Sequence, residues 1–593
     1  LKNFTFQYLN NLNTLDLSYS SVELIEANAF HGLLKLRKLL LSGNKLRTIF
    51  ANTFQHLPNL FTLEMEASQI ETIESNAFYG LKNLFYLLIR KNPLVSIRSS
   101  SLAGLEGLIY FDLISCNISS IELDAFAWSP SLSSLDLSRN KLKILPNNTF
   151  QNFSQLKNLY LMRMGLEIIE LNAFSKLSAL NFLELSGNNI RVLRNNTFKD
   201  LKSLDELWLS ESNVEIIESN AFYGLKLLNR LLLNTNSIRT ISSSTFKHLT
   251  SLVLLDLRYS GIESIEANAF SGLTNLVSIW MNYNNFREVK SSTFQNLTRL
   301  YELDLQNCNI EFLDPKAILG KTNLRKFSAS DNNIQIIYNN TFKYLINLEI
   351  VDLSNSNIEI IEANAFSDKC LIRKLLLNKN KLRILFNFMF RNLGILKYLD
   401  LTNSGIEIIE RNAFYGLKNL TDLNLANNKI TQLEDFTFDG LQNLRELDLS
   451  NSNIQIINQN AFSGLIKLKS LYFNENNLNS TINQQTFANI NEIVFLDLKQ
   501  SRITSIDPFT FSSYKNLTRL NLNFNRLIEI KVNTFYGLEK VNILDLSYCG
   551  IEILHPGSFN GLFNVIVLTL NSNNLKYLPE NAFFYLYSMY ELN

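Results

Sequence analysis

The chain has 593 residues, about four times the roughly 150 residues of a typical domain, yet it contains no Pro- or Gly-rich linker. Its 55 Lys and Arg residues balance 54 Asp and Glu residues, so no overall field draws the chain to nucleic acid or to an acidic membrane, and we expect no nucleic-acid partner. Hydrophobic residues make up 46% of the chain, which excludes intrinsic disorder, and no apolar run reaches the roughly 18 residues that span a bilayer.

Phenylalanine recurs at one fixed spacing, that of Phe6 and Phe30, as far as Phe462, and after one extra residue near Asn479 the rhythm continues from Phe487 to Phe583. Leu102 and Ile318 fill the two gaps in this series. The unit that starts at Leu36 reads L-x-x-L-x-L-x-x-N-x-L-x-x-I-x-x-x-x-F-x-x-L. A repeat of this kind predicts a solenoid, in which each turn buries its apolar face against its neighbours.

Within each turn, the alternation of Leu39 and Leu41 with Lys38, Leu40 and Ser42 predicts a short strand that is buried on one face. These strands are expected to stack as a parallel sheet, with the phenylalanine column filling the space behind it. An inward asparagine such as Asn44 is expected to satisfy the backbone groups of the bend on the adjacent turn. This role explains part of the excess of asparagine, of which the chain has 80.

The Asn44 position alternates from turn to turn between asparagine and Ser, Cys or Met, so the full repeating unit is a pair of turns. Three residues further on, glutamates such as Glu167 and Glu215 alternate with cations such as Lys143 and Arg191. We interpret this row as a solvated charge ladder that fixes the register of the turns.

Chemistry that would indicate an enzyme is absent from the sequence. No Gly-rich phosphate loop, nucleophile motif or metal-ligand spacing occurs, so we expect no catalytic residue, no metal site and no cofactor. The four cysteines are at least two turns apart, too far for a disulfide, so we expect four thiols and no internal bridge. The three at the ladder position, Cys116, Cys308 and Cys549, are expected to be buried, and Cys370 lies outside the ladder.

The repeat resembles the typical class of extracellular leucine-rich repeats, and the match covers essentially the whole chain. The resemblance implies an α/β fold: a right-handed, curved solenoid with a parallel β-sheet on its concave face and a helix-poor convex side. We expect one domain over residues 1–593, with about 24 turns and without the Cys-rich caps usual at both ends of such proteins. The chain is similar to the ectodomains of Toll-like receptors and of chaoptin-type adhesion proteins, which implies an extracellular location, secreted or anchored at the cell surface.

The concave face is the surface that such solenoids commonly use for binding. Most pair-leading turns present an acid there, such as Asp112 or Asp256, whereas two present an aromatic residue instead. Because interfaces favour aromatic residues next to arginine, we predict a protein-binding patch formed by Tyr160, Met162, Arg163, Trp208, Tyr259, Trp280 and Tyr283.

Ten N-x-S/T sequons occur, although this composition gives roughly 11 by chance. Asn117 directly follows the ladder position and is a poor candidate for a glycan. The expected glycosylation sites are Asn3, Asn147, Asn152, Asn195, Asn296, Asn339, Asn419, Asn479 and Asn516.

Two other functions remain open on the sequence. Near-perfect repetition favours a structural protein whose copies associate in a matrix or filament, because a ligand site usually requires more local departure from the pattern. A cytosolic inhibitor of another protein fits the unpaired cysteines but not the helix-poor repeat.

Overall fold

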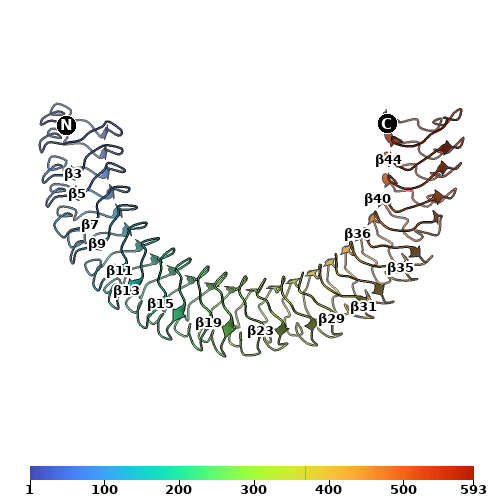
Figure 1. The fold of residues 1–593 in the computed structure, drawn as a ribbon, viewed down its shortest axis with the longest axis horizontal. Helices are drawn as coiled ribbons and strands as arrows, with labels where there is room; N and C mark the ends of the chain where they lie inside the picture. Colours follow the sequence, from blue (N-terminus) through green and yellow to red (C-terminus); the bar gives the residue numbers. More distant parts are fainter. Residues whose placement is uncertain (368) are drawn as a thin grey trace. The chain divides into compact units, whose positions relative to one another are not determined.

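The computed structural model describes residues 1–367 and 369–593. Every regular element in these residues is a strand, and none of them forms a helix long and apolar enough to cross a membrane. The chain divides into two compact units, which are described separately: unit 1 comprises Leu1–Phe286 and Ser292–Leu300, and unit 2 comprises Arg287–Ser291 and Tyr301–Asn593. In each unit the strands stack turn upon turn (Figure 1).

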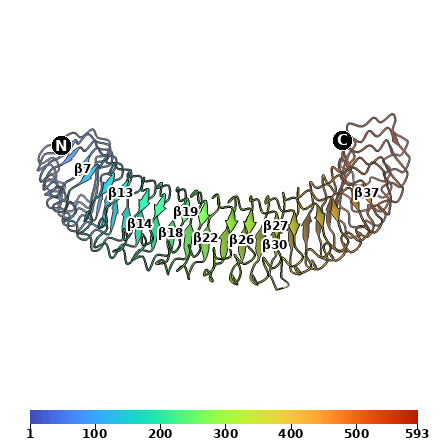
Figure 2. The same cartoon turned by 60° about the horizontal axis from the view of Figure 1, so that its bottom comes forward.

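Each turn of unit 1 contributes one main strand of three residues. Its central side chain points inward and the two beside it point outward, so Leu39 is fully buried whereas Lys38 and Leu40 are half-buried. Successive main strands are parallel and pair in register, as Leu39 does with Leu63, and Figure 2 shows several of them side by side. The main strands of unit 1 are β1 (Thr14–Asp16), β2 (Lys38–Leu40), β4 (Thr62–Glu64), β6 (Tyr86–Leu88), β8 (Tyr110–Asp112), β10 (Ser134–Asp136), β12 (Asn158–Tyr160), β14 (Phe182–Glu184), β16 (Glu206–Trp208), β18 (Arg230–Leu232), β20 (Leu254–Asp256) and β22 (Ser278–Trp280).

Unit 2 repeats the same arrangement, and the residue added near Asn479 shifts the numbering without breaking the pairing, since Leu471 pairs with Leu496. Its main strands are β24 (Glu302–Asp304), β26 (Lys326–Ser328), β28 (Ile350–Asp352), β30 (Lys374–Leu376), β32 (Tyr398–Asp400), β34 (Asp422–Asn424), β36 (Glu446–Asp448), β38 (Ser470–Tyr472), β40 (Phe495–Asp497), β42 (Arg519–Asn521), β44 (Ile543–Asp545), β46 (Val567–Thr569) and β47 (Glu591–Leu592). The predicted solenoid with a parallel sheet is therefore confirmed, and the expected helix-poor return segments contain no helix in the described residues.

A second, short strand of two residues follows in most turns. In unit 1 these are β3 (Thr48–Ile49), β5 (Thr72–Ile73), β7 (Ser96–Ile97), β9 (Ser120–Ile121), β11 (Ile144–Leu145), β13 (Ile168–Ile169), β15 (Val192–Leu193), β17 (Ile216–Ile217), β19 (Thr240–Ile241) and β21 (Ser264–Ile265). In unit 2 they are β23 (Glu288–Val289), β25 (Phe312–Leu313), β27 (Ile336–Ile337), β29 (Ile360–Ile361), β31 (Ile384–Leu385), β33 (Ile408–Ile409), β35 (Gln432–Leu433), β37 (Ile456–Ile457), β39 (Thr481–Ile482), β41 (Ser505–Ile506), β43 (Glu529–Ile530) and β45 (Ile553–Leu554).

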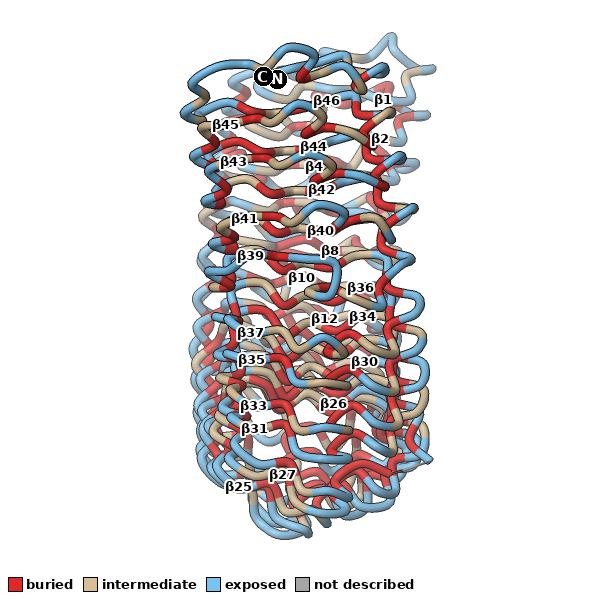
Figure 3. Tube along the Cα trace, turned by 90° about the vertical axis from the view of Figure 1, so that its right-hand side faces the viewer, coloured by how far each residue is buried: buried red, intermediate tan, exposed pale blue. Residues whose placement is uncertain are grey.

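Phenylalanine rings fill the interior behind the main strands of each unit. The ring centroids of Phe30, Phe54 and Phe78 follow one another at 6.0 Å in unit 1, and those of Phe414 and Phe438 lie 6.1 Å apart in unit 2. Paired strands lie only about 4.8 Å apart, so neighbouring turns are closer at the sheet than at the phenylalanine column. Each unit by itself therefore curves with its main strands on the inner side (Figure 1), and its buried residues recur at the same places from turn to turn (Figure 3).

The inward asparagines connect neighbouring turns as predicted. Asn140 Oδ1 accepts hydrogen bonds from the backbone N–H groups of Cys116 and Ile118 in the preceding turn, both at 2.9 Å. Its Nδ2 group donates to the carbonyls of Leu113 at 2.9 Å and of Leu137 at 2.6 Å. One buried side chain thus satisfies four backbone groups that would otherwise have no partner.

The short strands pair two by two, so junctions between turns are of two kinds. From an asparagine turn to the next serine turn the short strands pair, as β3 does with β5. From a serine turn to the next asparagine turn, such as from β5 to β7, the described strands do not pair. Besides the paired main strands, that junction is held by the ladder asparagine and by one further backbone hydrogen bond in place of the short-strand pair, for example from Lys45 N to Val22 O at 2.8 Å. The alternation explains why the sequence repeats in pairs of turns.

The predicted thiols and charge ladder are confirmed. All four cysteines are buried and none is in a disulfide. Burial raises the pKa of the Cys116 and Cys549 thiols to about 12, so neither is a reactive thiolate at neutral pH. On the surface, Lys143 Nζ lies 3.4 Å from a carboxylate oxygen of Glu167, one turn away.

Candidate functional site

The candidate site lies on the outward side chains of the main strands of unit 1. Tyr160, Trp208 and Trp280 occupy the third position of β12, β16 and β22. Arg163, Tyr259 and Tyr283 share a position in the bend after the strand, where the backbone has positive φ. These residues and Met162 are exposed or half-buried, so the predicted patch lies on the accessible face.

The first cluster of the patch joins three successive main strands through their rings. Phe182, on β14, lies between Tyr160 and Trp208, with ring centroids 5.2 Å and 5.0 Å away. The Trp208 indole Nε1 donates a hydrogen bond of 3.0 Å to Glu206 Oε2, which fixes the orientation of its ring. The first cluster (Tyr160, Phe182 and Trp208) is therefore a rigid aromatic surface with one anchored tryptophan.

Arg163 extends along the stack rather than toward the aromatic rings. Its guanidinium reaches Glu211, two turns away, with 3.6 Å between Nη2 and Oε2. On the way it crosses Gly187, where a Cβ atom would lie 2.5 Å from Arg163 Cγ. Gly187 therefore leaves the space for this side chain, and its φ of +74° is one that glycine adopts without strain.

The second cluster is built around Arg258, on the bend after β20. Its guanidinium donates to both oxygens of the buried Asp256, at 2.9 and 2.7 Å, and lies 4.9 Å from the centroid of the Trp280 ring. Next to it the rings of Tyr259 and Tyr283 stack, with centroids 4.3 Å apart and planes 6° from parallel. The arginine is therefore held in one orientation before any ligand arrives.

A buried amide in the same cluster has an unused acceptor. The side chain of Asn282 is buried, and its Oδ1 atom has no hydrogen-bond partner. Asn282 precedes Tyr283, and its backbone carbonyl accepts the N–H of Tyr259 at 3.2 Å. A buried acceptor without a partner is rare and costs free energy, so it marks a place where a ligand donor would bind favourably.

The acids of this face have a structural role that the sequence pattern did not reveal. Most of them accept a hydrogen bond from the backbone N–H two residues ahead, as Asp112 does from Ile114 (3.0 Å) and Asp136 from Ser138 (2.9 Å). Burial raises the pKa of Asp112, Asp136 and Glu184, and backbone donors oppose the rise. The acids stabilise the bend after the strand while they place negative charge around Tyr160.

The structure brings the predicted patch residues into two groups rather than one. Tyr160 and Trp208 belong to the first cluster, and Tyr259, Trp280 and Tyr283 belong to the second. Strand β18, with Leu232 at its outward position, lies between them, since it pairs with β16 on one side and β20 on the other. Met162 is half-buried beside the first cluster, and its N–H bonds to Ser138 Oγ at 3.3 Å.

Sequence reasoning missed Phe182, Arg258 and Asn282, although each lies on a main strand or in the bend that follows one. It also missed a similar group in unit 2. There the rings of Phe524 and Tyr548 stack with centroids 4.5 Å apart, and the Oδ1 atom of Asn523 also has no partner. An aromatic residue at the bend position of two successive turns is the signal that finds both groups.

The predicted glycosylation sites are all accessible. Asn3, Asn147, Asn195, Asn296, Asn339, Asn419 and Asn479 are exposed, whereas Asn152 and Asn516 are half-buried. At Asn147, Asn195 and Asn339 the Oδ1 atom accepts an N–H of the next turn, at 2.9, 2.8 and 3.2 Å. The Nδ2 atom, where a glycan attaches, is not used in these bonds. Glycosylation of these residues stays a prediction.

The expectation that the chain has no metal site and no cofactor also stays a prediction. Within residues 1–367 and 369–593, no group of three or more His, Cys, Asp or Glu side chains is arranged to hold a metal ion. The titratable groups instead follow the stack in rows.

Comparisons with known proteins agree with this architecture. The family described as Leucine rich repeat matches residues 1–46, 35–94, 370–430, 418–478, 492–551 and 540–593. The family described as BspA type Leucine rich repeat region (6 copies) matches residues 71–205, 119–253, 191–325 and 240–373. No curated protein matches the sequence.

Among solved structures, the chain is similar to the protein in "Crystal structure of TLR13-ssRNA13 complex". The two share 22% sequence identity and a TM-score of 0.55, over 96% of this chain and 90% of that chain. An identity this low shows a shared fold and carries no argument about the ligand. Since each of the two repeat families matches more than half of the residues, the chain belongs to the leucine-rich repeat family.

Proposed function

We propose that the protein is a non-catalytic recognition protein that acts outside the cell and binds a protein ligand through the aromatic patch of unit 1. The observation that carries the proposal is the second cluster, in which Arg258 is fixed between Asp256 and Trp280 next to the stacked Tyr259 and Tyr283. Aromatic residues and arginine supply most of the binding energy at protein interfaces. Because these side chains are already ordered, binding costs little side-chain entropy.

The absence of catalytic function and the extracellular location belong to the same proposal. The repeat spreads titratable groups along a line instead of converging them on one reacting atom. Accessible sequons such as Asn147 and Asn195 fit passage through the secretory pathway.

The experiment compares binding partners captured by three forms of the secreted protein. The patch variant carries Tyr259→Ala and Trp280→Ala, and the matched control carries Tyr79→Ala and Tyr223→Ala, two exposed tyrosines of the return segments. We expect the wild type and the control to capture the same cell-surface or secreted protein, and the patch variant to lose it by at least about tenfold in affinity. If the patch variant captures the ligand as well as the wild type does, the patch is not the binding surface.

Nucleic acid is the other ligand class that the experiment distinguishes, because the similar solved structure is a TLR13–ssRNA13 complex. The first cluster of the patch is bordered by Asp112, Asp136 and Glu184, whose negative charge opposes a phosphate backbone. We therefore expect no salt-dependent binding of a single-stranded RNA oligonucleotide. Binding that weakens steeply with salt would overturn the choice of a protein ligand.

Self-association is a second candidate function, favoured by an exposed aliphatic row on the short strands. Ile144, Ile168 and Ile216 are 45%, 40% and 55% exposed and stand at the same repeat position. The adjacent charge ladder alternates in sign, so an antiparallel second copy would meet opposite charges along it. A molar mass above that of the monomer in solution, abolished by Ile168→Lys, would support this function.

A further inference from the structure

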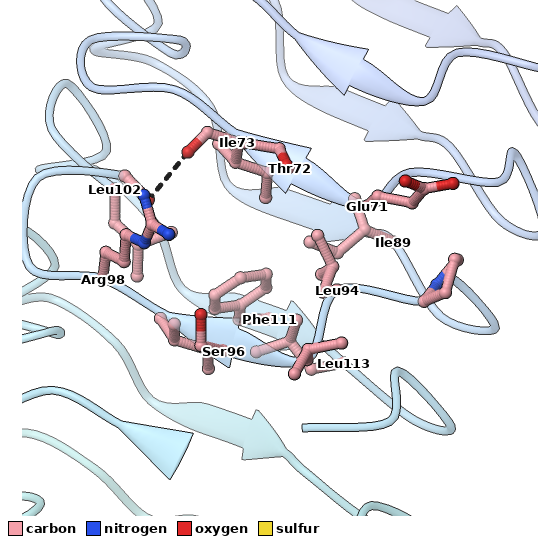
Figure 4. A pocket seen from close by; sticks show the side chains of 14 residues that line it. Glu71, Thr72, Ile73, Ile89, Leu94, Ser96, Arg98, Leu102, Phe111 and Leu113 are labelled. Carbon is pink, nitrogen blue, oxygen red and sulfur yellow. Dashed lines mark hydrogen bonds between the residues drawn. The ribbon is translucent and has the colours of Figure 1, made fainter. Parts of the chain in front are cut away.

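A cavity of about 440 Å³ opens into the interior of unit 1 between the turns that carry β5 and β7. Its walls are formed mainly by Ile73, Ile89, Leu94, Leu102, Phe111 and Leu113, and Figure 4 shows these side chains surrounding one space. The volume lies within the range of roughly 300–1,000 Å³ that is usual for small-molecule sites. Three departures from the repeat meet at this cavity.

The first departure is the missing ring at Leu102, which interrupts the phenylalanine column between Phe78 and Phe126. Elsewhere in this column rings follow closely, as Phe54 and Phe78 do at 6.0 Å. Phe111 replaces the strand leucine of the next turn and enters the space without filling it. Removing a large core side chain leaves a cavity where the surroundings cannot collapse.

The second departure is Pro93, at the junction where the short strands do not pair. In equivalent junctions of unit 1 the residue after the ladder asparagine donates its N–H to the preceding turn, from Lys45 to Val22 (2.8 Å) and from Lys141 to Ile118 (2.7 Å). Proline has no N–H group, so Pro93 cannot make this bond to Ile70. The two turns at the cavity therefore lack the backbone hydrogen bond that holds comparable turns together.

The third departure is Val95, whose φ is +61°. The Ser96 N–H bonds back to the Leu94 carbonyl at 2.7 Å, which closes a three-residue turn around this valine. Positive φ is strained for a β-branched residue, and such strain persists only where the surrounding structure imposes it. Because Val95 is 53% exposed, the strained residue forms part of the rim of the cavity.

The polar groups of the rim differ in their availability. Ser101 Oγ already donates to the Ile73 carbonyl at 3.0 Å, the contact drawn as a dashed line in Figure 4. Arg98 is exposed, and no ion pair of its side chain is present in the described residues. Figure 4 places Arg98 beside Leu102, at the end of the cavity away from Glu71. The site thus offers an apolar interior with a cation at its edge.

We propose that this cavity binds a small amphipathic carboxylate, with its apolar body among Leu94, Leu102 and Phe111 and its anionic end at Arg98. A simple packing defect would need only the change at Leu102. Here the missing ring, the missing backbone bond and the strained rim occur within residues 93–102. The other gap in the column gives a contrast, since in unit 2 Phe327 compensates for Ile318 by packing its ring 5.6 Å from Phe342.

The test measures binding of decanoate and of its uncharged analogue decanol to the full chain by titration calorimetry. We expect decanoate to bind at one site, and Leu102→Phe to weaken it by at least about tenfold because the new ring fills the cavity. The matched control is Ile318→Leu, a change of similar volume at the other gap in the column, where Phe327 already fills the space, and it is expected to leave binding unchanged. Equal binding by wild type and Leu102→Phe, or equal loss in both variants, would overturn the site.

Arg98→Ala tests whether the carboxylate of the ligand binds at Arg98. Because Arg98 is exposed, the substitution does not change the core, and the test does not depend on whether a core variant folds. We expect it to weaken decanoate several-fold and to leave decanol unchanged, whereas Arg194→Ala, at the same repeat position two pairs of turns away, changes neither. If Arg98→Ala binds decanoate like the wild type, the assignment of a carboxylate ligand is wrong. Neither result depends on the aromatic patch, so this site and the proposed protein-binding function fail or survive separately.

Discussion

The acidic side chains on the inner face of unit 1 stabilise the backbone but are themselves partly buried, which disfavours their charged form. Asp136 lies in register between Asp112 and Tyr160, and it accepts the N–H of Ser138. The bond stabilises the bend after the strand, but burial raises the pKa of the carboxyl above its ordinary value. The charge that results at neutral pH is therefore unfavourable in the folded chain.

Asp136→Asn should raise the free energy of unfolding at pH 7 by less than about 1 kcal/mol, and the thermal midpoint with it. The reason is that the amide keeps the acceptor oxygen and removes the charge. An acid whose folded pKa is raised contributes stability that is present below its unfolded pKa and is lost as the pH rises through its folded pKa. The advantage of the variant should therefore disappear below about pH 3.5, where the aspartate is protonated in both states. Thermal melts of the two proteins from pH 3 to pH 7 check this, and a less stable variant at pH 7 would show that the carboxylate is favourable.

Elements of this protein depend on their neighbours, since a strand of three residues has no stability alone. The main strands pair at every junction, and two further devices alternate along each unit: paired short strands at one junction and a ladder asparagine at the next. The serine turns use a smaller contact, as in Ser68 Oγ, which donates to the Leu41 carbonyl at 2.8 Å. Beyond the main strands, the stability of the asparagine junction therefore rests largely on a single side chain, whereas that of the other junction rests on paired short strands.

Asn140→Ala should destabilise unit 1 by at least about 3 kcal/mol, because it leaves buried N–H and C=O groups of two turns without partners. Urea unfolding followed by circular dichroism measures the loss. The exposed Asn181→Ala is the matched control and should change the midpoint little. Similar losses in both variants would mean that the ladder contributes no more than a surface asparagine.

At the scale of the whole molecule, the two proposed functions, recognition and self-association, require different parts of the surface to be free of glycans. An extracellular recognition protein needs its glycans on the return segments and its inner face open, and the sequons at Asn147, Asn195 and Asn339 meet the first demand. A self-associating protein instead needs the exposed aliphatic row on its short strands to be free of glycans. Light scattering before and after glycan removal separates the two functions.

We expect the secreted protein to be a monomer whose mass falls on treatment with an N-glycosidase. The combined changes Asn147→Asp, Asn195→Asp and Asn339→Asp should reduce this shift, and they keep the Oδ1 acceptor that each site uses in the fold. Asn117→Asp is the control and should leave the shift unchanged. A mass unaffected by the enzyme would contradict the extracellular location, and a large assembly would favour the structural function.

The fold could be predicted because every turn contacts the turns directly before and after it along the chain. The alternation at Leu39 and Leu41, the phenylalanine column and the Asn44 position each repeat so often that strand, core and ladder follow from the pattern. The patch was predicted less completely. Outward positions identified Trp208 and Trp280, but periodicity does not say which way a ring turns, so the bridging role of Phe182 was missed.

The sequence by itself therefore determined the repeating part of this protein: the parallel sheet, the buried asparagines and the alternation of turns. The tertiary structure decided which departures from the repeat form a cavity or a binding surface. Whether Leu102 leaves a cavity depends on how far Phe111, Pro93 and Val95 allow the neighbouring turns to close. The position of Arg258 likewise depends on Asp256 and Trp280 together. Each outcome results from packing among several side chains at once, and a one-dimensional period carries no information about that packing.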